Sequence, residues 1–161
     1  ADPLGKKFWP FYKGRDGSRT PMKWNDQKNA GFSQSSPWLP VDPDYQTLNV
    51  KTQLKDKDSL LNYYKNLIAL RNKEKALFQG VWVVFEEGRN GVIAFFRNTK
   101  KRSIMVVLNF KNKNTHIKIP VKGKWKVIFS THRTISARLI DPEGLMLGPF
   151  EVSMLKLKKE D

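Results

Sequence analysis

The stretch VWVVFEEGRNGVIAFFRN, residues 81–98, places the second half of this chain among β-structures. Two runs rich in β-branched and aromatic residues flank Gly88, Arg89, Asn90 and Gly91. Glycine and asparagine between two such runs are typical of the turn of a β-hairpin. The stretch therefore predicts two adjacent antiparallel strands.

Further short runs with a period of two continue to the end of the chain. They are SIMVVLNF, HIKI, KWKVIF and FEVSMLKL, separated by the turn-forming stretches KNKN, PVKG and DPEG. Six or seven short strands joined by tight turns predict a small antiparallel sandwich or barrel. This portion, roughly 80 residues long, is large enough to close a core of its own.

One amphipathic helix precedes the strands. In DKDSLLNYYKNLIALRNKEKAL the apolar side chains recur at helical spacing, at Leu60, Leu61, Tyr64, Leu67 and Ile68. Asp58 or Ser59 is a suitable N-cap, and Gly80 ends the pattern. The apolar stripe of this helix needs a partner surface.

Residues 1–55 are rich in Pro, Gly and Asn and show no sustained period, which predicts a long loop region with one short helical turn. The segment nevertheless holds eight aromatic side chains, at Phe8, Trp9, Phe11, Tyr12, Trp24, Phe32, Trp38 and Tyr45. Disordered segments lack such residues. We therefore expect the loop to be ordered against a core, which a portion N-terminal to this chain would supply.

The net charge of +15 is concentrated in the β-rich half, where no Asp or Glu occurs between Gly88 and Ile140. A basic surface can bind a polyanion. In HIKIPVKGKWKVIF, however, lysines alternate with apolar residues, as in a strand with one solvated face. We favour the solvated face, and nucleic-acid binding remains a less favoured alternative.

Several other classes of protein are disfavoured. No apolar run approaches the length of a membrane span, and the N-terminus lacks the order of a signal peptide, so a cytoplasmic location is expected. The absence of cysteine removes disulfides and thiolate metal sites. His116 and His132 are isolated in the β-region, where structural or surface roles are expected. We predict neither a metal site nor a cofactor.

The loop carries several motifs in order: GRDGSRTPMKW (residues 14–24), NAGFS (29–33), PWLPV (37–41), Asn49–Val50, Gln53 and SLLNYYKNLIALR (59–71). Together they resemble the α-glucosidase and oligo-1,6-glucosidase branch of glycoside hydrolase family 13, the α-amylase family, with trehalose synthases nearby. The resemblance runs from about Asp2 to Leu77. The β-rich remainder is similar in placement to the C-terminal domain of that family.

The resemblance implies a division of the chain into two parts. Residues 1–79 are similar to the end of a catalytic (β/α)8 barrel, namely the loop after the last strand and the last helix, and residues 80–161 to the all-β C-terminal domain. The expected fold class is mainly β, an antiparallel β-sandwich preceded by a long ordered loop and one amphipathic helix. The implied partner is the N-terminal barrel portion, as a separate chain or a missing segment.

The resemblance also implies that this chain alone is inactive. Retaining glycosidases use two carboxyl groups about 5–5.5 Å apart, and in this family these lie on or after earlier barrel strands. The acidic pairs present here, Asp42 with Asp44, Asp56 with Asp58 and Glu86 with Glu87, lie in a loop, before a helix and before a turn. We expect no catalytic residue in this chain. The implied substrate is an α-glucan or oligosaccharide.

One residue is expected to contact substrate. Arg19, in the SRTPM motif, is similar in position to a family arginine that reaches the pocket for the non-reducing-end glucose. A guanidinium can serve a carboxylate and a sugar hydroxyl together. The alternative is that Arg19 only ties the loop down through a salt bridge.

Arg15, Asp16, Trp24, Phe32 and Trp38 are expected to be structural anchors of the loop, although the three aromatic rings could also stack on glucose. Two departures from the family pattern leave the substrate preference open. Lys23 stands where the family usually has Gln, and Asn25 stands where Asp is common. A second hypothesis makes the β-domain a stand-alone carbohydrate-binding or interaction module.

Overall fold

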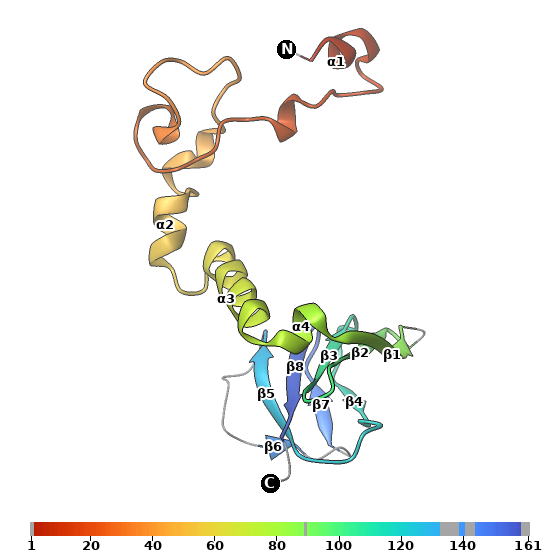
Figure 1. The fold of residues 1–161 in the computed structure, drawn as a ribbon. Coiled ribbons are helices and arrows are strands. Elements are labelled where there is room, and N and C mark those ends of the chain that lie inside the picture. Colours follow the sequence, from red (N-terminus) through yellow and green to blue (C-terminus); the bar gives the residue numbers. More distant parts are fainter. Residues whose placement is uncertain (1, 89, 133–138, 141–143, 159–161) are drawn as a thin grey trace. The chain divides into compact units, whose positions relative to one another are not determined.

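The computed structural model (Figure 1) describes residues 2–88, 90–132, 139–140 and 144–158. The contacts within the chain divide it into two compact units, Ala1–Ala69 and Leu70–Asp161. No helix in these described ranges is long and apolar enough to cross a membrane.

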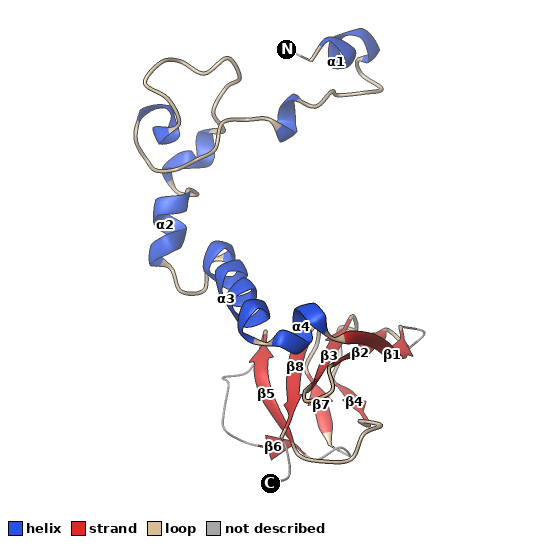
Figure 2. Cartoon of the chain, in the orientation of Figure 1, coloured by secondary structure: helices blue, strands red, loops and turns tan. Residues whose placement is uncertain are grey.

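The first unit consists of short helices joined by loops (Figure 2). They are α1 (Pro3–Phe8), the 3-10 helices η1 (Asp16–Ser18), η2 (Lys28–Gly31) and η3 (Pro43–Gln46), α2 (Val50–Lys55) and most of α3 (Leu60–Lys73). Side chains cap the N-termini of several of these helices. At α1, Asp2 accepts from the Leu4 amide, and at α2, Asn49 forms a reciprocal capping box with Thr52. More helix forms here than the one turn that the sequence predicted.

Helix α3 confirms the predicted amphipathic helix. It begins one residue after Ser59, whose hydroxyl accepts from the amide of Asn62 at 3.3 Å. None of its residues is buried, and Ile68, at the centre of the apolar stripe, is 56% exposed. The described part of the chain therefore leaves much of this stripe exposed.

The second unit is an antiparallel β-structure preceded by the short helix α4 (Lys75–Gln79). The described residues form eight strands: β1 (Val81–Glu87), β2 (Val92–Asn98), β3 (Ser103–Asn109), β4 (Thr115–Ile117), β5 (Trp125–Ser130), β6 (Leu139–Ile140), β7 (Leu145–Leu147) and β8 (Val152–Leu157). Six of them form one sheet in the order β1-β2-β3-β8-β5-β6, and β4 pairs with β7 in a second sheet. The predicted mainly β fold is confirmed.

The predicted hairpin is confirmed at residues 81–98. Strands β1 and β2 pair antiparallel, and the amide of Gly91 donates to the carbonyl of Gly88 at 2.8 Å. Gly88 and Gly91 both have positive φ, at 89° and 68°, which explains the glycines at the two ends of the turn. Arg89, between them, lies outside the described residues.

The core lies between the six-stranded sheet and the β4–β7 pair. It is formed by buried apolar residues that alternate along the strands: Val92, Ala94, Phe96, Met105, Val107, Ile117, Ile119, Trp125, Val127, Leu145, Leu147 and Leu155. The Trp125 ring is fully buried, 5.9 Å from the ring of Phe96. Two packed layers around such a core define a β-sandwich.

The alternation predicted for HIKIPVKGKWKVIF is confirmed except at Val121, which is 37% exposed. Ile117, Ile119, Trp125 and Val127 are buried, whereas the intervening lysines Lys118, Lys124 and Lys126 are exposed. Three other basic residues of the β-rich half, Arg89, Arg133 and Arg138, lie outside the described residues. The described lysines thus belong to a solvated face.

Beyond the short helices of residues 1–55, three described elements were not expected from the sequence: α4, β6 and β7. Strands β6 and β7 are two and three residues long, too short to show a period of two. Helix α4 holds five residues and follows α3 after one intervening residue, so its pattern merges with that of the longer helix.

Candidate substrate-binding loop

The segment that carries the sequence motifs is anchored at its beginning by a buried carboxylate. The Asp2 carboxylate accepts from the backbone amide of Arg15 and from its Nε, each at 2.9 Å. The Asp2 amide donates to Asp16 Oδ2 at 2.9 Å. Arg15 and Asp16, two of the five residues predicted as loop anchors, thus meet at Asp2.

Electrostatics strengthen this anchor. The Arg15 guanidinium, hydrogen bonded to Asp2, holds the pKa of the Asp2 carboxyl well below its usual range, and the backbone amides of Arg15 and Leu4 act in the same direction. Asp2 raises the pKa of Arg15 in return. The carboxylate therefore stays charged, and the anchor intact, to acidities at which a free aspartate would be protonated.

A tight left-handed turn lies under the NAGFS motif. Asn29, Ala30 and Gly31 have consecutive φ values of 54°, 56° and 67°. The carbonyl of Ala30, which is fully buried, accepts from the amides of Trp24 and Asn25 at 2.9 and 3.1 Å. Left-handed backbone in a non-glycine residue is costly, so these bonds must hold the turn against its strain.

Gly31 is a position in this turn where a side chain would be strained. A Cβ on Gly31 would lie 2.4–2.7 Å from the amide group of Asn25, and its φ of +67° already disfavours other side chains. Asn25 in turn accepts from the amide of Gln27 at 2.9 Å. The turn, the glycine and the asparagine form one packed unit.

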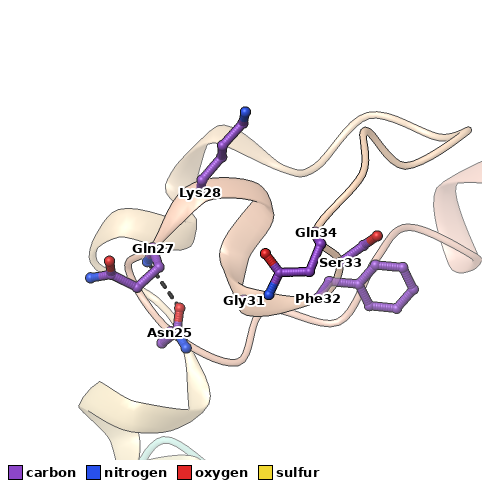
Figure 3. A pocket seen from close by; sticks show the side chains of 7 residues that line it. All are labelled: Asn25, Gln27, Lys28, Gly31, Phe32, Ser33 and Gln34. Carbon is purple, nitrogen blue, oxygen red and sulfur yellow. Dashed lines mark hydrogen bonds between the residues drawn. The ribbon is translucent and has the colours of Figure 1, made fainter.

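An open pocket of about 520 Å³ lies beside this turn. It is lined by Asn25, Gln27, Lys28, Gly31, Phe32, Ser33 and Gln34. Figure 3 shows the amides of Asn25 and Gln27 on one side and the ring of Phe32 on the other, with the Gln34 amide between. Amides, a hydroxyl and one aromatic ring can hydrogen bond and stack on a sugar, but the lining holds no carboxylate for catalysis.

The predicted site residues do not gather in this pocket. Phe32 lines it and is 48% exposed, whereas Arg19, Trp24 and Trp38 are not among its lining residues. Trp24 is 50% exposed and Trp38 72% exposed. These side chains lie open to contacts that this chain does not provide.

Arg19 is exposed at the end of η1, where its backbone amide donates to the carbonyl of Asp16 at 3.0 Å. Its guanidinium makes no hydrogen bond or ion pair with the described residues. The salt bridge that would make Arg19 a simple loop anchor is thus not formed within the described part of the chain. Its role in binding substrate stays a prediction.

The two positions that depart from the family pattern have local roles. Lys23 forms an ion pair with Asp44. Asn25 packs over Gly31, as described above. Sequence reasoning identified Asn25 only as a departure and missed Gln27 and Gln34, because only the turn places their amides around one pocket.

Helix α2 connects the loop to α3. Its amides of Val50 and Lys51 donate to the carbonyls of Lys23 and Trp24 at 2.9 and 3.0 Å. The Lys51 ammonium lies 3.0 Å from an Asp26 carboxylate oxygen and lowers the pKa of Asp26. The Gln53 side chain accepts from the amide of Leu61 at 3.0 Å. The motif residues at 49–53 therefore support the loop.

The acidic pairs considered from the sequence serve local structure. Asp42 accepts from the amide of Asp44 at 3.3 Å at the beginning of η3, and Asp56 accepts from the amide of Asp58 at 2.9 Å. Glu86 lies at the end of β1. No group of three or more His, Asp or Glu side chains in the described ranges could hold a metal ion.

The fold and the loop together define a class of protein: an all-β domain preceded by a segment of loops and short helices. Comparison with family models agrees with this class. The model of the α-amylase catalytic domain matches residues 4–80, and the model of the α-amylase C-terminal all-β domain matches residues 82–143.

Individual relatives are similar over nearly the whole chain. An oligo-1,6-glucosidase of Parageobacillus thermoglucosidasius is 38% identical over 92% of this chain, and a glucan 1,6-α-glucosidase of Streptococcus pneumoniae is 35% identical over 89%. The crystal structure of the isomaltulose synthase of Protaminobacter rubrum superposes with a TM-score of 0.76, at 33% identity over 92% of this chain. The chain covers only 26% of each of these relatives.

The chain belongs to the α-amylase family, glycoside hydrolase family 13. It corresponds to the end of the catalytic barrel and the C-terminal domain of its relatives.

Proposed function

We propose that this chain is the C-terminal part of a glycoside hydrolase that acts on α-glucans or short α-linked oligosaccharides. One observation carries the proposal: the match to the catalytic-domain model up to residue 80 is followed directly by the match to the C-terminal domain from residue 82. This is the order of the two domains in a complete enzyme of the family. The boundary that we propose lies between residues 79 and 80.

In this proposal the chain supplies two things to the enzyme. The loop at residues 14–41 forms part of the rim of the substrate pocket, and the β-domain stabilises the barrel. The exposure of Trp24, Phe32 and Trp38 supports the first role, because exposed aromatic faces stack well on sugar rings. The remaining barrel, in the cytoplasm, supplies the catalytic carboxylates.

Arg19 is the residue to which we assign substrate contact. Its guanidinium is exposed and makes no bond with the described residues, so all of its planar donors are available. We propose that it pairs with a carboxylate of the barrel and a hydroxyl of the terminal glucose. A charge-assisted pair of this kind fixes the orientation of the sugar.

The test is a chimaera in which this chain replaces the matching quarter of the P. thermoglucosidasius oligo-1,6-glucosidase. Purified chimaera is assayed with isomaltose, maltose and a nitrophenyl α-glucoside. The proposal predicts hydrolysis of at least one of them. A folded chimaera that releases glucose from none of the three would refute it.

A further inference from the structure

A second open pocket, of about 560 Å³, lies in the β-sandwich of the second unit. It opens between the β1 edge of the six-stranded sheet and strand β4 of the smaller sheet. Its lining includes Phe85, Glu86, Asn90, Lys111, Ile117 and Lys118. Ligand pockets in proteins usually have volumes of about 300–1,000 Å³. The pocket is therefore large enough to hold a small ligand.

A β-bulge in β1 turns two consecutive side chains to the same face of the sheet. The register between β1 and β2 shifts between Val84 and Glu86, so Phe85 is the extra residue. In a regular strand, Phe85 and Glu86 would point to opposite faces. Here Phe85 stacks on the core ring of Phe96, and Glu86 pairs with Ala94, which is fully buried in the core. The bulge thus brings a carboxylate to the inner face, where the pocket lies.

The floor of the pocket is apolar and rigid. Val92 and Ile117 line it and belong to the buried core. The Phe85 ring is stacked on that of Phe96, with centroids 4.7 Å apart and the planes inclined by 27°. Side chains packed in a core hold fixed positions. A fixed floor that includes an aromatic ring suits the apolar face of a sugar ring.

One wall of the pocket is fixed by the buried side chain of Asn109. Its oxygen accepts from the Lys111 amide at 3.1 Å and from the Thr115 hydroxyl at 3.3 Å. Its nitrogen donates to the carbonyls of Lys113 and Gly148, at 3.0 and 2.7 Å. The full bonding capacity of this amide is therefore used. Since Lys111 and Thr115 line the pocket, the wall is preorganised for a ligand.

The side chain of Lys111 also lies across the turn of the β1–β2 hairpin. A Cβ on Gly91 would lie 3.0 Å from the Cγ and the Cε of Lys111, so the lysine stem packs directly on the glycine. The amide of Phe110 donates to the Gly91 carbonyl at 2.9 Å and joins the two segments. Asn90 and Lys111 are thus held on the same side of the pocket.

Four polar side chains of the lining make no hydrogen bond or ion pair with the described residues. They are Glu86, Asn90, Lys111 and Lys118. A carboxylate accepts hydrogen bonds, an ammonium donates them, and an amide does both. The pocket therefore offers donors and acceptors together above one apolar floor.

The mixed charge of the lining favours a neutral ligand that is rich in hydroxyl groups. An anion such as phosphate would be repelled by the Glu86 carboxylate, and a cation would be repelled by Lys111 and Lys118. A hydroxyl group can donate to the carboxylate and accept from an ammonium. Saccharides combine such hydroxyl groups with an apolar ring face.

We propose that this pocket of the β-domain binds a saccharide, with Glu86 and Lys118 hydrogen bonded to its hydroxyl groups and Phe85 under one of its rings. The class of saccharide, a short α-linked glucan oligosaccharide, rests on the proposed function. The binding itself requires only residues of this chain.

Amide NMR of the 161-residue chain, titrated with maltotriose and with isomaltotriose, tests the proposal. The amides of Glu86, Asn90, Lys111 and Lys118 should shift and reach saturation with at least one trisaccharide. Inorganic phosphate at equal ionic strength is the anion probe and should leave these amides unmoved.

Two variants test the assigned contacts. Glu86→Ala and Lys118→Ala should each weaken trisaccharide binding about tenfold or more, the loss expected for a hydrogen bond to a charged group. Lys101→Ala is the matched control, because Lys101 is exposed between β2 and β3 and does not line the pocket. It should bind like the wild type. The amide spectrum of each variant shows whether it is folded.

Several results would overturn the proposal. Pocket amides that respond to neither trisaccharide would leave Glu86 only as an inward charge that prevents strand addition at the β1 edge. A response to phosphate alone would identify an anion site. Unchanged affinity in both Glu86→Ala and Lys118→Ala would place the saccharide elsewhere. A chimaera that binds trisaccharide at these residues but hydrolyses no substrate would refute the proposed activity and support the binding site.

Discussion

At the scale of single residues, the loop is held by a small number of specific contacts. Asp2 joins Arg15 and Asp16, and Gly31 fits beneath Asn25 where a side chain would be strained. The guanidinium of Arg19, which lies between these two places in the sequence, makes no bond to the described residues. A substrate-binding loop requires contacts that fix its backbone. It also requires a side chain that is free to contact the substrate.

The Arg19→Ala and Arg19→Lys variants test the substrate contact in the chimaera. Loss of a hydrogen bond to a charged group costs about 1.5–3 kcal/mol, so kcat/KM should fall by roughly 10- to 100-fold. Lysine should not restore it, because an ammonium cannot pair with two groups in a plane. Circular dichroism should be unchanged, and wild-type kinetics in both variants would remove Arg19 from the pocket.

The Asp2–Arg15 pair predicts that the Asp2 carboxyl titrates at lower pH than a free aspartate. Since the folded pKa of Asp2 lies below that of an unfolded aspartate, about 3.9, the pair stabilises the loop above that value. The stabilisation is lost as the pH falls further, towards the folded pKa. By carbon NMR, Asp2 should titrate below the usual range, and in Arg15→Gln its midpoint should rise. An unchanged midpoint would show that Arg15 is not the cause.

The left-handed turn predicts that one added methyl group at Gly31 destabilises the turn. In Gly31→Ala the left-handed conformation costs about 1–2 kcal/mol, and the Cβ meets the Asn25 amide. The amides of Trp24 and Asn25, which donate to Ala30, should then exchange with deuterium faster. Gly17→Ala is the control, since no atom lies within 4 Å of its Cβ, and it should exchange like the wild type. Equal exchange in both variants would contradict the turn.

At the scale of elements, α4 lies between α3 and the first strand, and it packs on the sheet. Leu77 is 7% exposed and belongs to a buried cluster with residues of β3, while Phe78, its neighbour in the same helix, is 41% exposed. The hydrogen bond from Arg71 to the Leu77 carbonyl, at 2.8 Å, holds the helix after α3. Truncation of Leu77 should therefore lower the stability of the chain much more than truncation of Phe78.

Leu77→Ala should lower the free energy of unfolding of the chain by about 2–4 kcal/mol, the cost of a cavity left by a buried leucine. Urea denaturation followed by circular dichroism measures it. Phe78→Ala should cost much less. The packing of α4 described here would be wrong if the two variants lost equal stability.

The elements predicted from the sequence are those whose signals are local. The hairpin at residues 81–98 depends on two glycines and its flanking strands, and α3 on a repeat of five apolar residues. The capping box of Asn49 and the pairing of β4 with β7 depend on contacts that no period reveals. The pocket at Asn25 and Phe32 required the backbone of residues 29–31, whose positive φ at Ala30 runs against its residue type.

At the scale of the whole molecule, several apolar surfaces are exposed. Much of the apolar stripe of α3 and most of the aromatic side chains of the loop are exposed in the described chain. The chain spans 26% of the length of its relatives. In the proposed enzyme, the barrel would bury these apolar surfaces. Among the described acidic side chains, Asp42 and Asp56 accept from nearby backbone amides, and Asp26 and Glu74 form ion pairs.

The most direct test compares the 161-residue chain alone with the chimaera in one assay of nitrophenyl α-glucoside hydrolysis. We predict that the chain alone releases nitrophenol no faster than buffer at any concentration, while the chimaera turns over. Hydrolysis by the chain alone that disappears on substitution of one of its own carboxylates would contradict the account.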